Sequence, residues 1–189
     1  MENLIKFFGH LRNILVHKFW VCHFGRMFGL GWWRCIMHDM SKFSYKEFWE
    51  SIKYYQGTSS PIPVCKRENG YSEAWQHHKG RNPHHYEYWT DNYDTGTTLI
   101  PMPYECFVEM MADWCAAGRT YQGKNWTFKS QRLWWDDKKT KNPAIHPMTM
   151  NLIDKFFGYE SPQLVISSDI FSLERGLYEL QLKNKVWIK

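Results

Sequence analysis

The sequence has no long apolar run and no secretory signal. Within its 189 residues, charged side chains interrupt every hydrophobic stretch well before the ~20 residues that a helix needs to span a bilayer. The first residues, Met-Glu-Asn, lead into no basic segment followed by an apolar stretch and a small-residue cleavage site. We therefore expect a soluble, cytoplasmic protein with no membrane partner.

Cysteine is scarce and irregularly placed. The number is odd, and no two cysteines have the Cys-x-x-Cys spacing, which argues against a disulfide framework and against a zinc knuckle. Buried free thiols are the expected state. The five positions are Cys22, Cys35, Cys65, Cys106 and Cys115.

Strand-like alternation, internal repeats and low-complexity segments are also absent. Instead, apolar residues recur every three or four positions, which is typical of helices. A chain of this length can bury a sizeable core in one domain, so the prediction is an all-α fold with a single-domain helical bundle. The expected helices cover about residues 4–22, 32–37, 45–55, 104–117, 147–157 and 172–183, with a short one after Ser72.

Two faces can be distinguished on the first helix. Leu4, Phe8 and Leu15 follow one apolar face, whereas His10 and His17, seven positions apart, share another. Further along, Ser44-Tyr45-Lys46-Glu47 has the form of a capping box, which accounts for Glu47 as a helix cap more simply than as a proton donor.

Two segments have no assigned helix. Residues 56–71 contain glycine, serine, two prolines and Asn-Gly, so we predict a loop with the composition of a lid. Residues 119–142 are polar and aromatic. Within them, Trp126, Trp134 and Trp135 lie among several basic residues, a pattern that fits either base stacking on nucleic acid or, more often, core packing. The formal charge of +5 suits an anionic substrate as well as nucleic acid.

The residues of greatest chemical interest are histidines and aspartates. His38-Asp39 is an adjacent pair that offers a neutral imidazole and a carboxylate able to bridge two cations. Other candidate ligands are spread along the chain before and after it. Together the set is sufficient for two metal ions, and it comprises His17, His38, Asp39, His77 or His78, His84 or His85, and Asp113.

Adjacent residues on a helix point about 100° apart, so we expect one histidine of each pair to face the metals. His78 and His84 are preferred, with His77 and His85 as alternates. The unused member of each pair would orient a ligand or contact substrate.

Several residues have structural alternatives. His10 and His23 compete with His17 as first ligand, but a structural role is favoured for both. Asp113 is interpreted as a ligand, although it would also fit as a cap or a partner of Arg119. His146, before a proline, is interpreted as a helix-start residue.

The segments HDMSKF, AWQHHKGRNPHHYEYW and MPYECFVEMMADW carry a family resemblance. Their order of His, His-Asp, His, His and Asp resembles the HD-domain superfamily of metal-dependent phosphohydrolases, and His38-Asp39-x-x-Lys42 is similar to the HD-GYP form of its motif. More closely, they resemble an uncharacterised bacterial and phage family of unknown function. The resemblance covers about residues 1–120 and implies an HD-type bundle, with a helical extension over about 143–189.

The resemblance also implies roles for individual residues. His17, His38, Asp39 and Asp113 would hold one metal, and Asp39 would bridge to a second metal held by the later histidines. A metal-bridged hydroxide would attack phosphorus. Lys42 would meet the phosphate as a point charge. Arg81 and Asn82, between the histidine pairs, would clamp the leaving group or an anionic oxygen, unless they form a solvated turn.

The leading functional hypothesis is therefore a phosphohydrolase acting on a nucleotide or other small phosphate ester, mono- or diester. Its cofactors would be two divalent transition metals drawn from Mn, Fe, Zn, Co and Ni. One alternative is an HD-type di-iron oxygenase that cleaves a carbon–phosphorus or carbon–carbon bond. Another is a non-enzymatic, metal-containing module that binds nucleic acid or a protein partner.

Overall fold

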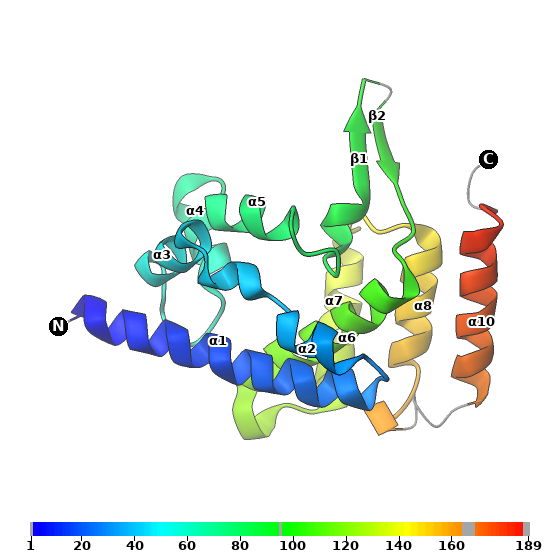
Figure 1. Cartoon of the computed structure of the whole chain (residues 1–189), viewed down its shortest axis with the longest axis horizontal. Coiled ribbons are helices and arrows are strands. Elements are labelled where there is room, and N and C mark those ends of the chain that lie inside the picture. The colour runs from blue at the N-terminus through cyan, green and yellow to red at the C-terminus, as the bar shows by residue number, and fades with distance from the viewer. Residues whose placement is uncertain (1, 95, 164–168, 187–189) are drawn as a thin grey trace.

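The computed structural model describes residues 2–94, 96–163 and 169–186, in which the regular structure is helical apart from one two-stranded sheet (Figure 1). This confirms the predicted all-α class. None of the described helices is both long and apolar enough to cross a bilayer. The helices are α1 (Glu2–Met27), α2 (Trp32–Met37), α3 (Tyr45–Lys53), α4 (Pro61–Asn69), α5 (Glu73–Lys79), α6 (Tyr104–Gln122), α7 (Phe128–Thr140), α8 (Pro147–Phe157) and α10 (Asp169–Lys183), with 3-10 turns η1 (Met40–Phe43), η2 (Tyr86–Trp89) and η3 (Gly123–Asn125).

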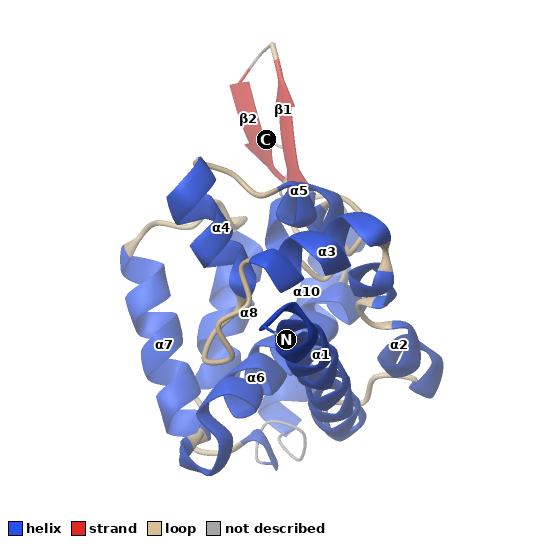
Figure 2. Cartoon of the chain, turned by 90° about the vertical axis from the view of Figure 1, so that its left-hand side faces the viewer, coloured by secondary structure: helices blue, strands red, loops and turns tan. Residues whose placement is uncertain are grey.

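Helix α6 is the centre of the fold. Every residue from Cys106 to Ala116 is buried, as expected for a helix with neighbours on all sides. Figure 2 looks toward the N-terminal end of α1, with α6 on one side of it and α2 on the other. Because α1 and α6 lie together along much of their length, residues far apart in the sequence come close on the faces where they meet.

The C-terminal helices pack on the same core. Phe156 of α8 lies with its ring centroid 6.2 Å from that of Phe107 in α6, and α10 lies beside α8 (Figure 1). Helix α8 has the predicted bounds, because Pro147 occupies its first turn, the His146 side chain accepts from the backbone N–H of Met148, and Gly158 follows its last residue. His146 is thus a helix-start residue, as expected.

Helix α1 presents its two faces in an unexpected way. The buried side chains include Ile14 and Val21 and also the two histidines His10 and His17. The apolar face predicted from the spacing of Leu4, Phe8, Leu15 and Phe19 exists, but these side chains are exposed. The helix is therefore apolar on both sides, with polar ligand atoms on the inner one.

The segments predicted without regular structure contain two helices. Helix α4 lies in the predicted loop 56–71; Pro61 occupies its first turn, where no backbone N–H is needed, and Gly70, with φ of 79°, ends it. Helix α7 lies in the segment 119–142 and begins at a capping box between Thr127 and Ser130. The proline and the polar residues in these segments stand at the first turns of helices. In the sequence they suggest a loop, because proline and polar residues disfavour the interior of a helix.

The predicted absence of strands was wrong. Strand β1 (Thr90–Tyr93) pairs antiparallel with β2 (Gly96–Leu99), Thr90 opposite Leu99, and the hairpin projects from the helical body (Figure 1). All of β2 except its last residue is exposed. A ribbon that buries neither face has no reason to alternate polar and apolar residues, so its sequence carries no strand signal.

The cysteines and tryptophans largely follow expectation. All five cysteines are free, four are buried, and Cys22 is half-buried. Trp135 is buried in the core, Trp126 packs against the core, and Trp134 is partly exposed. Core packing thus accounts for Trp126 and Trp135. Of the three tryptophans considered for base stacking, only Trp134 is exposed.

Candidate metal centre

The His-Asp pair lies in a sharp turn between α2 and η1. His38 follows the last residue of α2, and Asp39 has a left-handed backbone, with φ of 55°. Such a conformation is unfavourable for a residue other than glycine, and functional sites are where it is commonly retained. Lys18 of α1 supports the turn, because its Nζ donates to the carbonyl of His38 at 2.5 Å. Both side chains are buried.

One oxygen of Asp39 belongs to a first group of candidate ligands. His38 Nε2 lies 3.2 Å from Asp39 Oδ2, and His17 Nε2 lies 3.7 Å from the same oxygen. Asp113 Oδ1 is 3.0 Å from His17 Nε2. The potential ligand atoms of these four residues all lie within 4.8 Å of one another, so α1, the α2–η1 turn and α6 form one candidate site.

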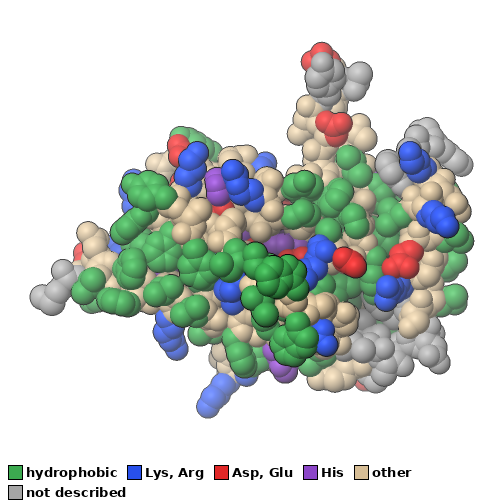
Figure 3. All heavy atoms as spheres, in the orientation of Figure 1, with side chains coloured by type: hydrophobic (Ala, Val, Ile, Leu, Met, Phe, Trp, Pro, Cys, Tyr) green, Lys and Arg blue, Asp and Glu red, His purple; other side chains and the backbone are tan. Residues whose placement is uncertain are grey.

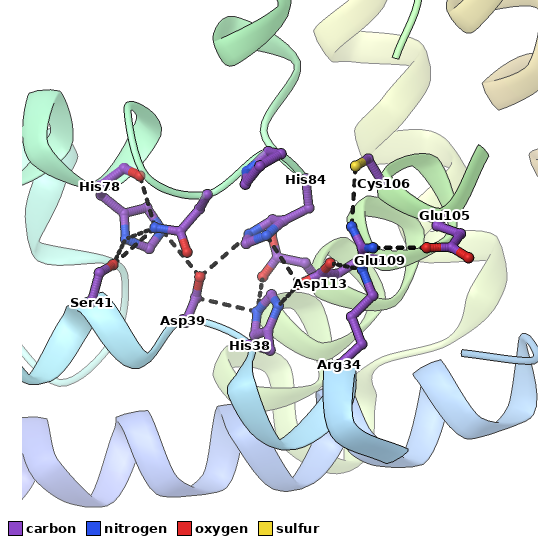
Figure 4. Close-up of polar contacts among 12 residues, drawn as sticks. Arg34, His38, Asp39, Ser41, His78, His84, Glu105, Cys106, Glu109 and Asp113 are labelled. Carbon is purple, nitrogen blue, oxygen red and sulfur yellow. Dashed lines mark hydrogen bonds and ion pairs between the residues drawn. The ribbon is translucent and has the colours of Figure 1, made fainter. Parts of the chain in front are cut away.

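The other oxygen of Asp39 belongs to a second group. His78 Nε2 and His84 Nε2 each lie 3.3 Å from Asp39 Oδ1, and His85 completes the group within the same 4.8 Å limit. Figure 4 shows Asp39 between His78 on one side and the neighbouring rings of His38 and His84 on the other. Asp39 is therefore shared by two adjacent groups, as a bridging carboxylate would be.

The polar atoms at the centre lack ordinary partners. Both oxygens of Asp39, and Nε2 of His17, His38, His84 and His85, are buried and make no well-aligned hydrogen bond among the described residues; the one cation beside Asp39 there is Lys42, whose Nζ lies 2.6 Å from Oδ2. A buried donor or acceptor left without a partner costs about 1–3 kcal/mol. A cation in each group would satisfy these atoms, and histidine nitrogen with carboxylate oxygen is a ligand set suited to transition metals. The residues present thus fit two metal ions.

Glu109, which sequence analysis did not consider, lies behind both groups. Its Oε1 is 2.9 Å from His38 Nδ1 and 3.2 Å from His84 Nδ1, while Arg34 Nε donates to its Oε2 at 2.6 Å (Figure 4). A carboxylate on the far nitrogen fixes the orientation of a metal-binding imidazole. Its sequence signal is its position four residues before Asp113, on the same face of α6.

Glu47 does the same for the later histidines, which corrects the capping-box interpretation. Ser44 Oγ does accept from the backbone N–H of Glu47, but the Glu47 carboxylate points inward, with Oε2 2.7 Å from His78 Nδ1 and Oε1 2.6 Å from His77 Nδ1. The cap uses only the backbone of Glu47, so its side chain is available to orient imidazoles.

The two histidine pairs behave differently. In α5, His78 belongs to the second group and His77 does not, as the angular separation of neighbours on a helix requires. His84 and His85 both belong to that group. Both therefore remain candidate ligands, because these residues lie in a turn before η2, outside any helix, where neighbouring side chains can converge; the choice of one of them stays a prediction.

Lys42 and Asn82 have partners that sequence analysis did not anticipate. Lys42 Nζ lies 2.6 Å from Asp39 Oδ2. Burial would lower the pKa of Lys42, but Asp39 and Asp113 outweigh it and raise that pKa. Asn82 is buried, and its Nδ2 donates to the carbonyl of His78 and to Ser41 Oγ. Asn82 therefore supports the site structurally, and Arg81 beside it is exposed; both line a cavity with His84, and their contact with substrate stays a prediction.

The carboxylates at the centre stay ionised. Burial alone would raise the pKa of Asp39, but His38 and Lys42 hold it well below its usual value. For Asp113, burial is likewise outweighed by the neighbouring imidazoles of His17 and His38, and the pKa is again well below its usual value. Ionised carboxylates are the form that binds metal.

The centre is reached through a cavity. A pocket of about 190 Å³ is lined by Lys42, His78 and Asp113 among others. It shares Trp75, His85 and other lining residues with a wider outer cavity of about 470 Å³. A small molecule entering the outer cavity would thus approach the second group of ligands.

Comparison with known proteins gives one family. The match is to the "Family of unknown function (DUF5662)" and covers residues 6–159. The chain belongs to this family. No curated protein and no solved structure matches the sequence significantly. The part of the chain that matches DUF5662 contains both groups of candidate ligands together with Glu47 and Glu109, so the whole centre lies within the family region.

Proposed function

We propose that this protein is a metal-dependent phosphohydrolase acting on a small phosphate ester. The observation that carries the proposal is Asp39, whose two oxygens face two separate groups of histidines with unpartnered Nε2 atoms. The order His, His-Asp, His, His and Asp, similar to that of HD-domain phosphohydrolases, supports it. Ligation of each metal by these residues, Asp39 bridging, is part of the proposal.

The chemistry needs few other protein groups. Two bound cations would supply an activated water and stabilise charge on phosphoryl oxygens. Asp39 and Asp113, ionised and buried, would hold the cations in place. Glu109 and Glu47 would keep His38, His84 and His78 in their orientations. Lys42, beside Asp39 and on the wall of the inner pocket, would stabilise the negative charge that develops on the phosphate.

The residues that line the outer cavity support the proposal that the substrate carries an aromatic group, as a nucleotide does. Lys66 Nζ lies 4.8 Å from the ring centroid of Trp75, and Lys138 Nζ lies 5.2 Å from that of Trp134. Both lysines and both tryptophans line this cavity. Aromatic faces stack on bases and ammonium groups attract phosphates, so the base and any further phosphate would lie here.

Elemental analysis tests the proposal first. Untagged protein purified without added metal should contain about two equivalents of transition metal, and Asp39→Ala should lose most of both because it removes a ligand from each group. The matched control is Asp91→Ala, which changes an exposed aspartate of β1 and should keep the metals. Absence of bound metal, even after reconstitution with manganese, iron and zinc, would contradict the proposal.

Activity is tested separately with a panel of nucleotides and other phosphate esters. Lys42→Met should retain both metals and lose hydrolysis by ~10²-fold, the usual effect of removing one transition-state contact. Iron content accompanied by substrate-dependent oxygen uptake, without phosphate release, would instead favour the di-iron oxygenase alternative.

A further inference from the structure

The outer face of α1 is the largest feature that the proposed metal chemistry leaves unexplained. Its side chains Leu4, Ile5, Phe8, Leu15 and Phe19 are 54–70% exposed. Figure 3 shows hydrophobic side chains in a broad band along α1 and onto α2. Such a face would be unfavourable in water if it stayed uncovered.

The band continues onto neighbouring elements at both ends of α1. Near the N-terminus, the ring of Phe7 lies beside Phe8 and Trp49, with centroid distances of 5.3 and 6.2 Å. Near the C-terminal end, the guanidinium of Arg26 lies 4.8 Å from the ring centroid of Trp32. We call the whole band the α1 surface. It comprises Leu4, Ile5, Phe8, Leu15, Phe19, Trp32, Trp33, Ile36, Met37, Met40, Phe43, Tyr45 and Trp49, all at least 40% exposed.

We propose that the α1 surface is a self-association interface, on which a second copy of this chain packs with its α1 antiparallel about a two-fold axis near Leu15. The exposed area is sufficient. An aromatic side chain has roughly 150–250 Å² to bury, so the exposed parts of these residues amount to on the order of 1,000 Å². A stable dimer needs about 800 Å² per partner, whereas the largest apolar patch of a typical monomer is about 300–600 Å².

The positions along α1 suit a helix partner. The exposed side chains Leu4, Phe8, Leu15 and Phe19 are separated by four, seven and four residues, which is close to the heptad spacing of a seam between two packed helices. The helix has 26 residues and is therefore about 39 Å long, which gives an extended contact. In the antiparallel arrangement the aliphatic end, with Leu4 and Ile5, would face the end that carries Trp32 and Trp33 in the second copy.

Charge also favours this arrangement. Glu2 is the acidic residue in the first turn of α1, and Arg26 is the basic residue in its last turn. Antiparallel packing would bring Glu2 of each copy near Arg26 of the other, and it would oppose the two helix dipoles favourably. Parallel packing would instead bring like charges together.

Few cations on this surface are available for anionic lipid. Lys6 is paired with Glu2, Arg34 is paired with Glu105 and Glu109, and Arg26 and Lys18 donate to backbone carbonyls, which leaves the exposed Arg12 as the cation of α1 that could meet a lipid headgroup. The side of α1 opposite the α1 surface is buried against the core, unlike the charged polar face of a helix that lies on a membrane. A second protein copy fits these features better.

The test is the mass of the full chain in solution, measured by light scattering after gel filtration at micromolar concentrations. The wild type should have twice the 22.9 kDa of one chain. Leu15→Glu should be a monomer, with dimerisation weakened at least ~100-fold, because a two-fold axis would bring both introduced charges together. The matched control is Leu133→Glu on α7, where the leucine is 59% exposed, and it should remain a dimer.

Circular dichroism and thermal unfolding check that Leu15→Glu is folded. Crosslinking tests the orientation: under oxidation Leu15→Cys should form a disulfide between copies, whereas Leu4→Cys should not, with wild-type protein as the control for Cys22. A monomeric wild type at 100 µM, a dimer unaffected by Leu15→Glu, efficient Leu4→Cys crosslinking, or binding of the monomer to vesicles of phosphatidylcholine and phosphatidylserine would each overturn the proposal.

Discussion

His38 and His84 are oriented by the same atom. Glu109 Oε1 lies 2.9 Å from Nδ1 of His38 and 3.2 Å from Nδ1 of His84, and the two imidazole centroids are 4.4 Å apart. The opposite nitrogens of these rings belong to the two different groups of candidate ligands that share Asp39. One buried glutamate, Glu109, therefore orients a candidate ligand in each of the two groups. Its substitution should weaken the binding of both metals.

Glu109→Ala should weaken the binding of both metals by ~10–100-fold each, the usual effect of losing a residue that orients a ligand. Chelator competition on the reconstituted protein measures both affinities. Glu105→Ala is the matched control, because Glu105 pairs with the same Arg34 but is exposed and belongs to neither group. Loss of only one metal in Glu109→Ala would contradict the shared role.

The two histidines of α5 should differ in their effect on metal content. His78→Ala should remove about one equivalent of metal, because His78 belongs to the second group, and His77→Ala should remove none. Glu47→Ala should weaken the same single metal, since Glu47 Oε2 lies 2.7 Å from His78 Nδ1. Elemental analysis of the three variants distinguishes these outcomes, and equal losses in His77→Ala and His78→Ala would show that the assignment within the pair is wrong.

His10 should make the metal-free protein sensitive to mild acid. Burial, with a smaller contribution from Lys42, lowers the pKa of His10 to about 4, while the unfolded chain has the ordinary value near 6.5. Between these values the unfolded state binds more protons, so stability is fully present above pH ~6.5 and is lost as the pH falls toward ~4.

His10→Phe should remove this sensitivity and preserve the aromatic contacts with Phe48 and Tyr55. Between pH 7 and pH 5 the wild type should lose about 2 kcal/mol more unfolding free energy than the variant. Urea unfolding of the metal-free proteins at both pH values measures the difference. Equal losses would mean that His10 is protonated in the folded state.

Gly118 and Gly176 should respond oppositely to alanine. A Cβ at Gly118 would clash with the side chains of Gln131 and Trp126, whereas one at Gly176 would meet nothing within 4 Å. Gly118→Ala should therefore destabilise the protein by ~1–3 kcal/mol. Gly176→Ala, in the middle of α10, should stabilise it by up to ~1 kcal/mol. Denaturant unfolding measures both, and a neutral Gly118→Ala would show that α7 moves away at little cost.

The fold was predictable where local signals were strong. Apolar periodicity located α1, α6 and α8, and Pro147 with Gly158 gave the limits of α8. Prediction failed where a residue type fits more than one structural role. Proline suggested a loop around Pro61, but Pro61 begins α4. Gly118 is expected to follow the end of a helix, but it lies inside α6, where the side chains of Gln131 and Trp126 leave no room for a Cβ. The hairpin β1–β2 left no signal because neither strand forms part of the core.

The sequence alone determined which chemical groups are present, because ligand types and helical spacing are local properties of the chain. It placed His38 and Asp39 at a junction and His10 and His17 on one face of α1. Only the tertiary structure decided which groups meet. The contact of α1 with α6 brings His17 to Asp113, and the turn after α5 lets His84 and His85 converge. Glu47 and Glu109 have no distinctive sequence context, but both are buried in the folded protein. A buried carboxylate needs polar partners inside the protein, and for these two the partners are the imidazoles of the candidate ligands.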